Sequence, residues 1–304
     1  MAKRSPAARR VTRALVYPLE AIGAVLLFGL FRALPLDAAS GFGGWLGRTL
    51  GPRLGITRRA VRNIRRALPE KTDVEIAVII TEMWDNLGRV VGEYPHLDRI
   101  GAAPEKGGRV TVEDWSLVEP FRGEDGAPCI LFSGHLANWE AFALYARNNG
   151  LGYAQIYRPA NNPMVDALMR RVRRLDDADI APKGAGGARK AIKLLRAGKR
   201  IGMLVDQKLN DGIDVPFFGL SAMTAPAPAQ LGLRLGCAVV PARIERLGGC
   251  HFRVSFLPPL TLPDTGDRKS DVAAMMGEVN RLLEGWIRER PGQWLWLHRR
   301  WPDS

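Results

Sequence analysis

The sequence predicts an α/β fold: a mixed, mostly parallel sheet flanked by helices, with an N-terminal membrane-anchoring helical segment. Two observations carry this prediction. From about residue 108 onward, short apolar segments of strand character alternate with longer segments of helical period, which is typical of a sheet covered by helices. Residues 1–66, in contrast, are basic and partly apolar, with thirteen Lys or Arg against two acidic residues.

The composition limits the classes of protein to which the chain can belong. Its 304 residues, 46% hydrophobic and 25% charged, can bury a core, which excludes global disorder. No uncharged apolar run reaches ~18 residues, which excludes a polytopic membrane protein. The three cysteines have no C-x-x-C spacing, so neither a disulfide scaffold nor a metal site is expected. Such sparse cysteines are typical of a reducing compartment such as the cytoplasm.

Residues 1–40 are interpreted as a basic and apolar membrane anchor. The uncharged stretch 21–31 would cover only ~16 Å as a helix, whereas the hydrocarbon core of a bilayer is ~30 Å thick. An interfacial helix, held by anionic inner-membrane lipids that attract the basic residues, is therefore favoured. A single span, a cleaved signal peptide and a helix buried in the core are the alternatives.

The rest of the chain is predicted to contain a helical lead-in at residues 55–100 and an α/β core at 108–304. The glycine-rich segment 41–56 is expected to link or bend the chain. Thr57 is the expected N-cap of a first helix, and Asp73–Val91 has apolar residues at the spacing of a second. One face of the first helix is a candidate anion contact, or else a solvated face, and consists of Arg58, Arg62, Arg65 and Arg66.

Six strands and five helices are predicted in the core. The strands are Arg109–Val112, Cys129–Phe132, Tyr153–Tyr157, Ile201–Val205, Ala238–Arg243 and Phe252–Phe256. The helices are Asn138–Asn148, Pro163–Leu175, Gly187–Ala197, Pro226–Leu235 and Asp271–Arg290. In such folds ligands bind beyond the carboxyl ends of the strands, so polar residues there are the candidates for a site.

The first of these strand ends carries the strongest catalytic pattern. Strand Cys129–Phe132 runs into His135, and the next helix has Glu140 in its first turn. A His in a turn can fold back toward a first-turn carboxylate, whereas two residues five apart on one helix lie ~140° apart. We predict that His135 is a general base whose tautomer is fixed by Glu140. The alternative is a His that only satisfies the turn.

Polar residues also follow the next strands. Arg158 is expected to hold a phosphate or stabilise an oxyanion, unless it forms a plain salt bridge to Asp206 or Glu140. Asp206 is expected to position Arg158 or an acceptor hydroxyl, with Gln207 beside it. The backbone N–H groups near Asn138 are further oxyanion candidates.

The loop after these residues, 209–223, contains the apolar sequence VPFFG. Its Phe217 and Phe218 are predicted to close over a chain-like apolar ligand. The alternative is that both side chains are buried in the core.

Several blocks together resemble one known family. They are GHLANWE, YRPANNP, DQK followed by VPFFG, TAPAPAQLGLRLGCAVVPARI and QWLWLHRRW, in this order. The sequence resembles the late acyltransferases of lipid A biosynthesis, the lauroyl and myristoyl transferases of the lysophospholipid acyltransferase superfamily. The resemblance extends from about Arg58 to Trp301, makes 41–304 the acyltransferase domain, and maps the family's H-x-x-x-x-D/E motif onto His135 and Glu140.

The resemblance implies a reaction and a location. A fatty acyl group would pass from acyl carrier protein to a hydroxyl of a lipid A precursor at the cytoplasmic face of the inner membrane. The acyl thioester is then a co-substrate and no cofactor is needed. One alternative is a superfamily member that acts on another membrane lipid. A second is a basic nucleic-acid-binding protein, suggested by the net charge of +13, but no recognised nucleic-acid motif supports a nucleic-acid partner.

Overall fold

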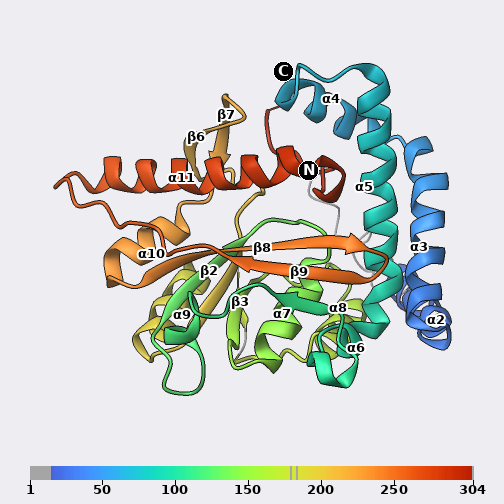
Figure 1. Ribbon diagram of the computed structural model, residues 1–304, viewed down its shortest axis with the longest axis horizontal. Coiled ribbons are helices and arrows are strands. Elements are labelled where there is room, and N and C mark those ends of the chain that lie inside the picture. The colour runs from blue at the N-terminus through green and yellow to red at the C-terminus, as the bar shows by residue number, and fades with distance from the viewer. Residues whose placement is uncertain (1–14, 179, 183, 303–304) are drawn as a thin grey trace.

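The computed structural model describes residues 15–178, 180–182 and 184–302 (Figure 1). Its centre is a seven-stranded sheet in the order β1-β9-β8-β2-β5-β3-β4. Neighbouring strands are parallel except for the antiparallel pair β8 and β9. The strands are β1 (Val110–Val112), β2 (Cys129–Ser133), β3 (Tyr153–Tyr157), β4 (Ile180–Pro182), β5 (Arg200–Leu204), β8 (Ala238–Gly248) and β9 (His251–Phe256). The predicted mixed, mostly parallel sheet is confirmed.

Helices lie on both faces of this sheet. Figure 1 shows α11 and a small hairpin on one face, and α7 and α8 on the other. The helices of this part are α6 (Leu97–Ile100), α7 (Trp139–Asn148), α8 (Pro163–Val172), α9 (Ala185–Arg196), α10 (Ala227–Leu235) and α11 (Arg268–Glu289). On the α11 face the ring of Phe132 stacks on Trp286 with centroids 6.4 Å apart.

Two elements of the core were not predicted. Strand β4 is only three residues long and lies at the edge of the sheet. The segment expected to be a loop at 209–223 contains an antiparallel hairpin, β6 (Ile213–Phe217) and β7 (Leu220–Thr224). The turn between them places Phe218 at φ 54° and Gly219 at φ 68°, a left-handed pair that closes a tight hairpin.

The segment before the core is a stack of helices at one end of the sheet (Figure 1). These are α2 (Tyr17–Ala33), α3 (Leu36–Leu50), α4 (Thr57–Ala67) and α5 (Asp73–Glu93). Helix α5 begins as predicted, with a capping box between Thr72 and Glu75. The predicted N-cap role of Thr57 is wrong, because Thr57 is already helical and its hydroxyl donates to Gly51 O at 2.7 Å.

The expected glycine linker is wrong, because most of the segment 41–56 belongs to α3. Its glycines allow α3 and α5 to approach each other closely. A Cβ on Gly43 would lie 2.3 Å from Gly88 O, and one on Gly88 would lie 2.1 Å from Gly43 O. Such distances are far below van der Waals contact, so only hydrogen fits at these two positions.

Helix α2 presents an apolar surface to solvent. Leu19 is 69% exposed and Leu26 68% exposed, and Ile22 lies between them at 55%. Asn162, just before α8, ties the start of this helix to the core, because its side-chain amide donates to Tyr17 O at 2.7 Å. Among the described residues no helix is both long and apolar enough to cross a bilayer.

Candidate active site

The topology of the sheet brings His135 and Asp206 together. Strands β2 and β5 are parallel neighbours with Ser133 opposite Leu204, so the residues that follow each strand meet at one edge. His135 Nδ1 lies 2.7 Å from Asp206 Oδ1, and the His135 backbone N–H donates to Asp206 Oδ2 at 2.9 Å. The two contacts fix the imidazole relative to its own backbone.

Asp206 is fully buried and ionised. A third hydrogen bond reaches it from Trp294 Nε1, 2.7 Å from Oδ2. Burial alone would raise the pKa of this carboxyl, but the His135 ring, its hydrogen bonds and the His298 ring together hold the pKa well below its usual range. A carboxylate can only accept hydrogen bonds, so Nδ1 of His135 must be the donor in this contact and carries the ring proton. The lone pair of the ring is therefore on Nε2.

Gln207 connects His135 to a second imidazole, that of His298. The side-chain nitrogen of Gln207 lies 3.0 Å from His135 Nε2 and 3.0 Å from His298 Nε2. An amide nitrogen carries two hydrogens, so Gln207 donates one to each ring. Burial, with the nearby His135 and Arg59, lowers the pKa of His298 to about 4, which keeps His298 neutral and able to accept.

Glu140 does not contact His135, which corrects the predicted pairing. Helix α7 begins at Trp139, and its first turn directs the Glu140 carboxylate toward α8. There it accepts from Arg173 Nε at 2.7 Å and from Trp139 Nε1 at 3.1 Å. The Trp139 ring meets the His135 ring edge-on, with centroids 5.1 Å apart. Asp206 therefore orients His135, while Glu140 reaches it only through Trp139.

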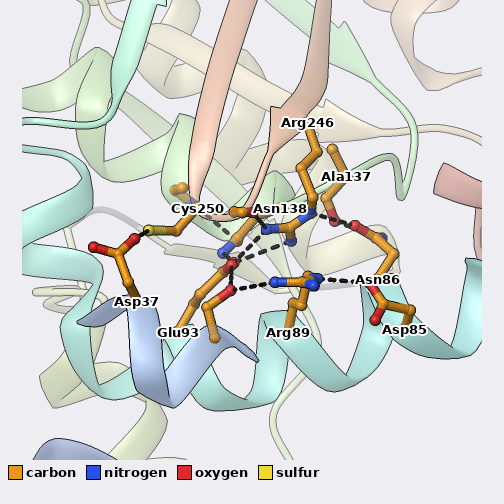
Figure 2. Close-up of polar contacts among 12 residues, drawn as sticks. Asp37, Asp85, Asn86, Arg89, Glu93, Ala137, Asn138, Arg246 and Cys250 are labelled. Carbon is orange, nitrogen blue, oxygen red and sulfur yellow. Dashed lines mark hydrogen bonds and ion pairs between the residues drawn. The ribbon is translucent and has the colours of Figure 1, made fainter. Parts of the chain in front are cut away.

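A buried polar network holds the turn between His135 and α7 (Figure 2). Asn138 caps α7 by accepting the Ala141 N–H at 3.1 Å, and its side-chain amide donates to Glu93 Oε2 at 2.8 Å. Arg246 binds the same carboxylate and also donates from Nε to Asn86 Oδ1 at 2.8 Å. Both ends of the Asn138 side chain are therefore engaged in this network, and the side chain is fully buried.

The same network fixes a strained residue. Ala137 has φ 46°, a conformation that costs a non-glycine residue about 1–3 kcal/mol. Its carbonyl accepts from Asn86 Nδ2 at 3.0 Å, and its N–H donates to Gln293 O at 2.9 Å. The N–H groups of Trp139 and Glu140 follow in the first turn of α7 and have no acceptor among the described residues. They remain candidates for oxyanion contacts.

Arg158 lies apart from this cluster. It is exposed after the end of β3, and the structure contains neither of the expected ion pairs between the described side chains of Arg158 and Asp206 or Glu140. The expectation that Asp206 positions Arg158 is wrong, because the hydrogen bonds of Asp206 go to His135 and Trp294. A contact of Arg158 with substrate stays a prediction.

Phe217 and Phe218 lie in the core, the position that the alternative interpretation gave them. The Phe217 ring is fully buried and stacks on Trp301 with centroids 5.7 Å apart, and Phe218 is 7% exposed. The pair supports the C-terminal segment that carries His298. No ligand-covering lid is formed by these two side chains.

The basic helix α4 packs against the same C-terminal segment. Asn63 donates to Trp296 O and His298 O, both at 2.8 Å, and Arg66 donates to Pro302 O at 2.8 Å. Of the predicted anion contacts, Arg65 pairs with Asp73 at 2.8 Å, and the two remaining ones, Arg58 and Arg62, are exposed. The side of α4 that carries Asn63 and Arg66 therefore lies beside the segment that completes the site, whereas Arg58 and Arg62 face solvent.

A cavity of about 340 Å³ opens at the Gln207–His298 contact. It is lined by Gln207, Lys208, Asn210, His298, Arg299, Trp301 and Pro302. A larger cavity of about 530 Å³ lies between α11 and the segment 257–263, and none of His135, Asp206 and Glu140 lines it. The smaller cavity is lined by the imidazole of His298 and is connected to His135 through Gln207.

The fold and the site define a class of protein: an α/β enzyme in which an aspartate-oriented histidine can remove a proton from a hydroxyl group. The model of one family, the bacterial lipid A biosynthesis acyltransferases, matches residues 5–303. The chain belongs to this family, and it is an acyltransferase of lipid A biosynthesis. The predicted family is thereby confirmed, and the nucleic-acid alternative loses its support.

Two curated proteins agree with this assignment. The chain is 28% identical over 278 residues to the lipid A biosynthesis acyltransferase of Haemophilus influenzae, covering 86% of this chain and 83% of that protein. It is 29% identical over 150 residues to the lipid A biosynthesis lauroyltransferase of Escherichia coli, covering 48% of this chain and 47% of that protein.

Among solved structures, the 1-acyl-sn-glycerophosphate acyltransferase PlsC of Thermotoga maritima matches 81% of this chain and all of that chain. The identity is 13% and the TM-score 0.36. At that TM-score the likeness establishes no shared detail of the site.

Sequence reasoning missed two residues of the site, His298 and Arg173. His298 is one of only four histidines and lies in the block QWLWLHRRW, so the scarcity of histidines was a usable signal. Arg173 gives no such signal, because it is one of four arginines in the stretch RRVRR at 170–174. Only the position of α8 shows which of them reaches Glu140.

Proposed function

We propose that this protein transfers a fatty acyl group from acyl carrier protein to a hydroxyl group of a lipid A precursor, with His135 as the general base. The observation that carries the proposal is the hydrogen bond between His135 Nδ1 and the buried carboxylate of Asp206. It leaves the lone pair on Nε2, where the only described contact is the amide of Gln207, a residue that lines the cavity of about 340 Å³.

The reaction begins when the acceptor hydroxyl displaces the Gln207 amide from His135 Nε2. As Nε2 takes the proton, the hydroxyl oxygen attacks the thioester carbonyl and forms a tetrahedral oxyanion. Asp206 stabilises the imidazolium that results. Collapse of the oxyanion breaks the carbon–sulfur bond, and the imidazolium returns its proton to the leaving thiolate, which yields the ester and a free thiol.

The oxyanion needs donors that are in place before the reaction. The first-turn N–H groups of Trp139 and Glu140 are suited to this, because they lie at the positive end of the α7 dipole. Arg158 is the second candidate, since its exposed guanidinium lies at the same edge of the sheet. Glu140 is a positioning residue in this mechanism, because it acts on His135 through Trp139.

The catalytic proposal is tested with His135→Ala. The expected fall in kcat is about 10²- to 10⁴-fold, the usual contribution of a general base. His251→Ala is the matched control, because His251 is exposed on β9 and away from the site. The proposal fails if His135→Ala transfers acyl groups at nearly the wild-type rate while the His251 control is also active.

The donor and the acceptor are tested separately. Acyl carrier protein thioesters and coenzyme A thioesters of one chain length are compared as donors, with a lipid A precursor as acceptor. We expect clear preference for the carrier protein. The alternative from the same superfamily, transfer to another membrane lipid, would instead give products with that lipid and none with the lipid A precursor.

We propose that residues 1–40 anchor the protein to the cytoplasmic face of the inner membrane. Support comes from the exposed apolar side chains of α2, such as Leu19 and Leu26, and from basic residues that attract anionic lipids at ~1 kcal/mol each. The double substitution Leu19→Glu with Leu26→Glu should reduce the fraction that sediments with membranes. The control is Val74→Glu, at an exposed position of α5. Equal sedimentation of both variants would refute the anchor.

A further inference from the structure

We propose that the cavity at the Gln207–His298 contact is a subsite for a phosphate group of one of the two substrates, with Lys208 as its main cationic contact. The inference rests on the proposed acyl transfer and adds to it a second point of recognition, next to the reacting atoms. It follows from the chemistry of the cavity lining, the charges behind it and the position of the cavity.

The lining of the cavity consists mainly of hydrogen-bond donors. Lys208 is half-buried and has no carboxylate partner among the described residues, and Arg299 adds a second positive charge. Asn210 provides an amide. His298 is neutral and accepts from Gln207 through Nε2, so its own hydrogen is on Nδ1, which is a donor. Within the part of the chain that the structure describes, no acidic residue lines this cavity.

A buried guanidinium behind the lining strengthens the positive potential. Arg300 is fully buried, and its hydrogen bonds go to neutral oxygens, among them Met223 O at 3.0 Å and Thr224 Oγ1 at 2.7 Å. Burial lowers the pKa of Arg300 to about 10, despite the opposing effect of Asp206 and Glu284. The group therefore stays charged at neutral pH without a carboxylate in contact, and it lies between two residues that line the cavity, Arg299 and Trp301.

Arg59, on helix α4, adds a further positive charge near His298. Its guanidinium donates to Leu297 O at 3.2 Å, while its Nε is buried without a hydrogen-bond partner. The charge is close enough to contribute to the lowered pKa of His298. Two cations, Lys208 and Arg299, thus line this space, Arg59 and Arg300 add positive charge near it, and none of its described lining residues is an anion. A phosphate has the charge and the acceptor oxygens that this space lacks.

The dimensions also suit this ligand. A volume of about 340 Å³ accommodates a phosphate together with the atoms on either side of it. Because Gln207 lines the cavity and also contacts His135 Nε2, the phosphate would lie close to the reacting hydroxyl or thioester. Two sources fit: the phosphodiester of a phosphopantetheine-linked donor, and a phosphate ester on the acceptor glycolipid.

The kinetic test uses Lys208→Gln and Lys208→Arg in the full-length protein. We expect Lys208→Gln to raise KM about tenfold or more for the substrate that carries the phosphate, since a charge-assisted hydrogen bond is lost. Lys208→Arg should restore most of the affinity. A rise confined to the donor identifies the phosphopantetheine arm, and one confined to the acceptor identifies its phosphate. Lys199→Gln is the control, because Lys199 is exposed at the opposite edge of the sheet.

A binding test separates this inference from the proposed function. Methyl phosphate is titrated into the wild-type protein while the ring signals of the four histidines are followed by NMR. We expect the signals of His298 and His135 to shift in the wild type and not in Lys208→Gln. If the wild type transfers acyl groups but Lys208→Gln has unchanged KM values and unchanged shifts, the phosphate subsite is refuted and the acyl transfer stands. If phosphate binds through Lys208 but no acyl transfer is detected, the proposed reaction fails instead.

Discussion

The substitution Asp206→Asn should move the ring proton of His135 from Nδ1 to Nε2 while leaving the site in place. Asp206 accepts three hydrogen bonds, and two of them, from the His135 backbone N–H and Trp294 Nε1, converge on Oδ2. Both donors are obligatory, so the amide oxygen of the variant must occupy the Oδ2 position. The amide NH₂ then takes the Oδ1 position, 2.7 Å from His135 Nδ1. A donor at that place forces Nδ1 to accept, which moves the ring proton to Nε2.

The expected fall in kcat follows from this change of tautomer. With Nε2 protonated, His135 has no lone pair for the acceptor hydroxyl, and the imidazolium loses its counter-charge. Loss of both effects in comparable aspartate–histidine pairs lowers kcat by about 10⁴-fold, or roughly 5.5 kcal/mol in the activation barrier. The fold should lose only about 1–2 kcal/mol, because two of the three hydrogen bonds remain.

The assay measures kcat for acyl transfer together with the ¹⁵N ring shifts of His135, which report the tautomer directly. Asp264→Asn is the control, since Asp264 is exposed in the loop before α11. The reasoning is refuted if Asp206→Asn keeps kcat within about threefold of wild type, or if its ring shifts still show a proton on Nδ1.

Three further predictions concern stability. Arg173→Ala should destabilise the fold by about 3–5 kcal/mol, because it leaves the buried Glu140 carboxylate unpaired; urea unfolding measures this, and a loss below about 1 kcal/mol contradicts it. Gly88→Ala should lower Tm and separate α3 from α5, because a Cβ there has no room. Gly277→Ala, at an open position of α11, should instead raise stability by about 0.5–1 kcal/mol. Equal changes of Tm in the two variants would disprove the close-packing argument. His298 has a pKa of about 4 in the fold, against about 6.5 in the unfolded chain. Between these two pH values the unfolded chain binds more protons than the folded one. The free energy of unfolding therefore falls as the pH drops from 6.5 to 4, by up to about 3 kcal/mol. His298→Gln should remove that part of the pH dependence in unfolding titrations, and an unchanged slope would show that His298 is not its source.

The sequence was informative about the fold wherever local pattern and tertiary structure agree. Apolar periodicity located the helices and six of the seven sheet strands. It failed for α3, because glycine has a low helix propensity and the benefit of its small size appears only when α5 lies alongside. The turn of the β6–β7 hairpin was missed for a related reason. Phe218 adopts a positive φ there, a conformation that is rare for phenylalanine and that the sequence therefore does not indicate.

The site was predictable in its location but not in its pairing. His135 and Asp206 each follow a strand, and both were expected at one edge of the sheet. Which carboxylate reaches the imidazole depends on β5 lying next to β2, a consequence of chain topology that residue spacing does not contain. Glu140 was favoured because it is near in sequence, whereas the actual partner is 71 positions away. His298 is still more remote, and only the folded chain places it beside Gln207.

The segment from Gln293 to Trp301 has a consequence for how the enzyme is made. It supplies the acceptor for Ala137 N–H, the Trp294 donor to Asp206 and the imidazole beside Gln207. Along the chain these residues come after every other part of the site, while α2 precedes all of it. The geometry around His135 is therefore complete only when residues 293–301 have packed against the rest of the domain.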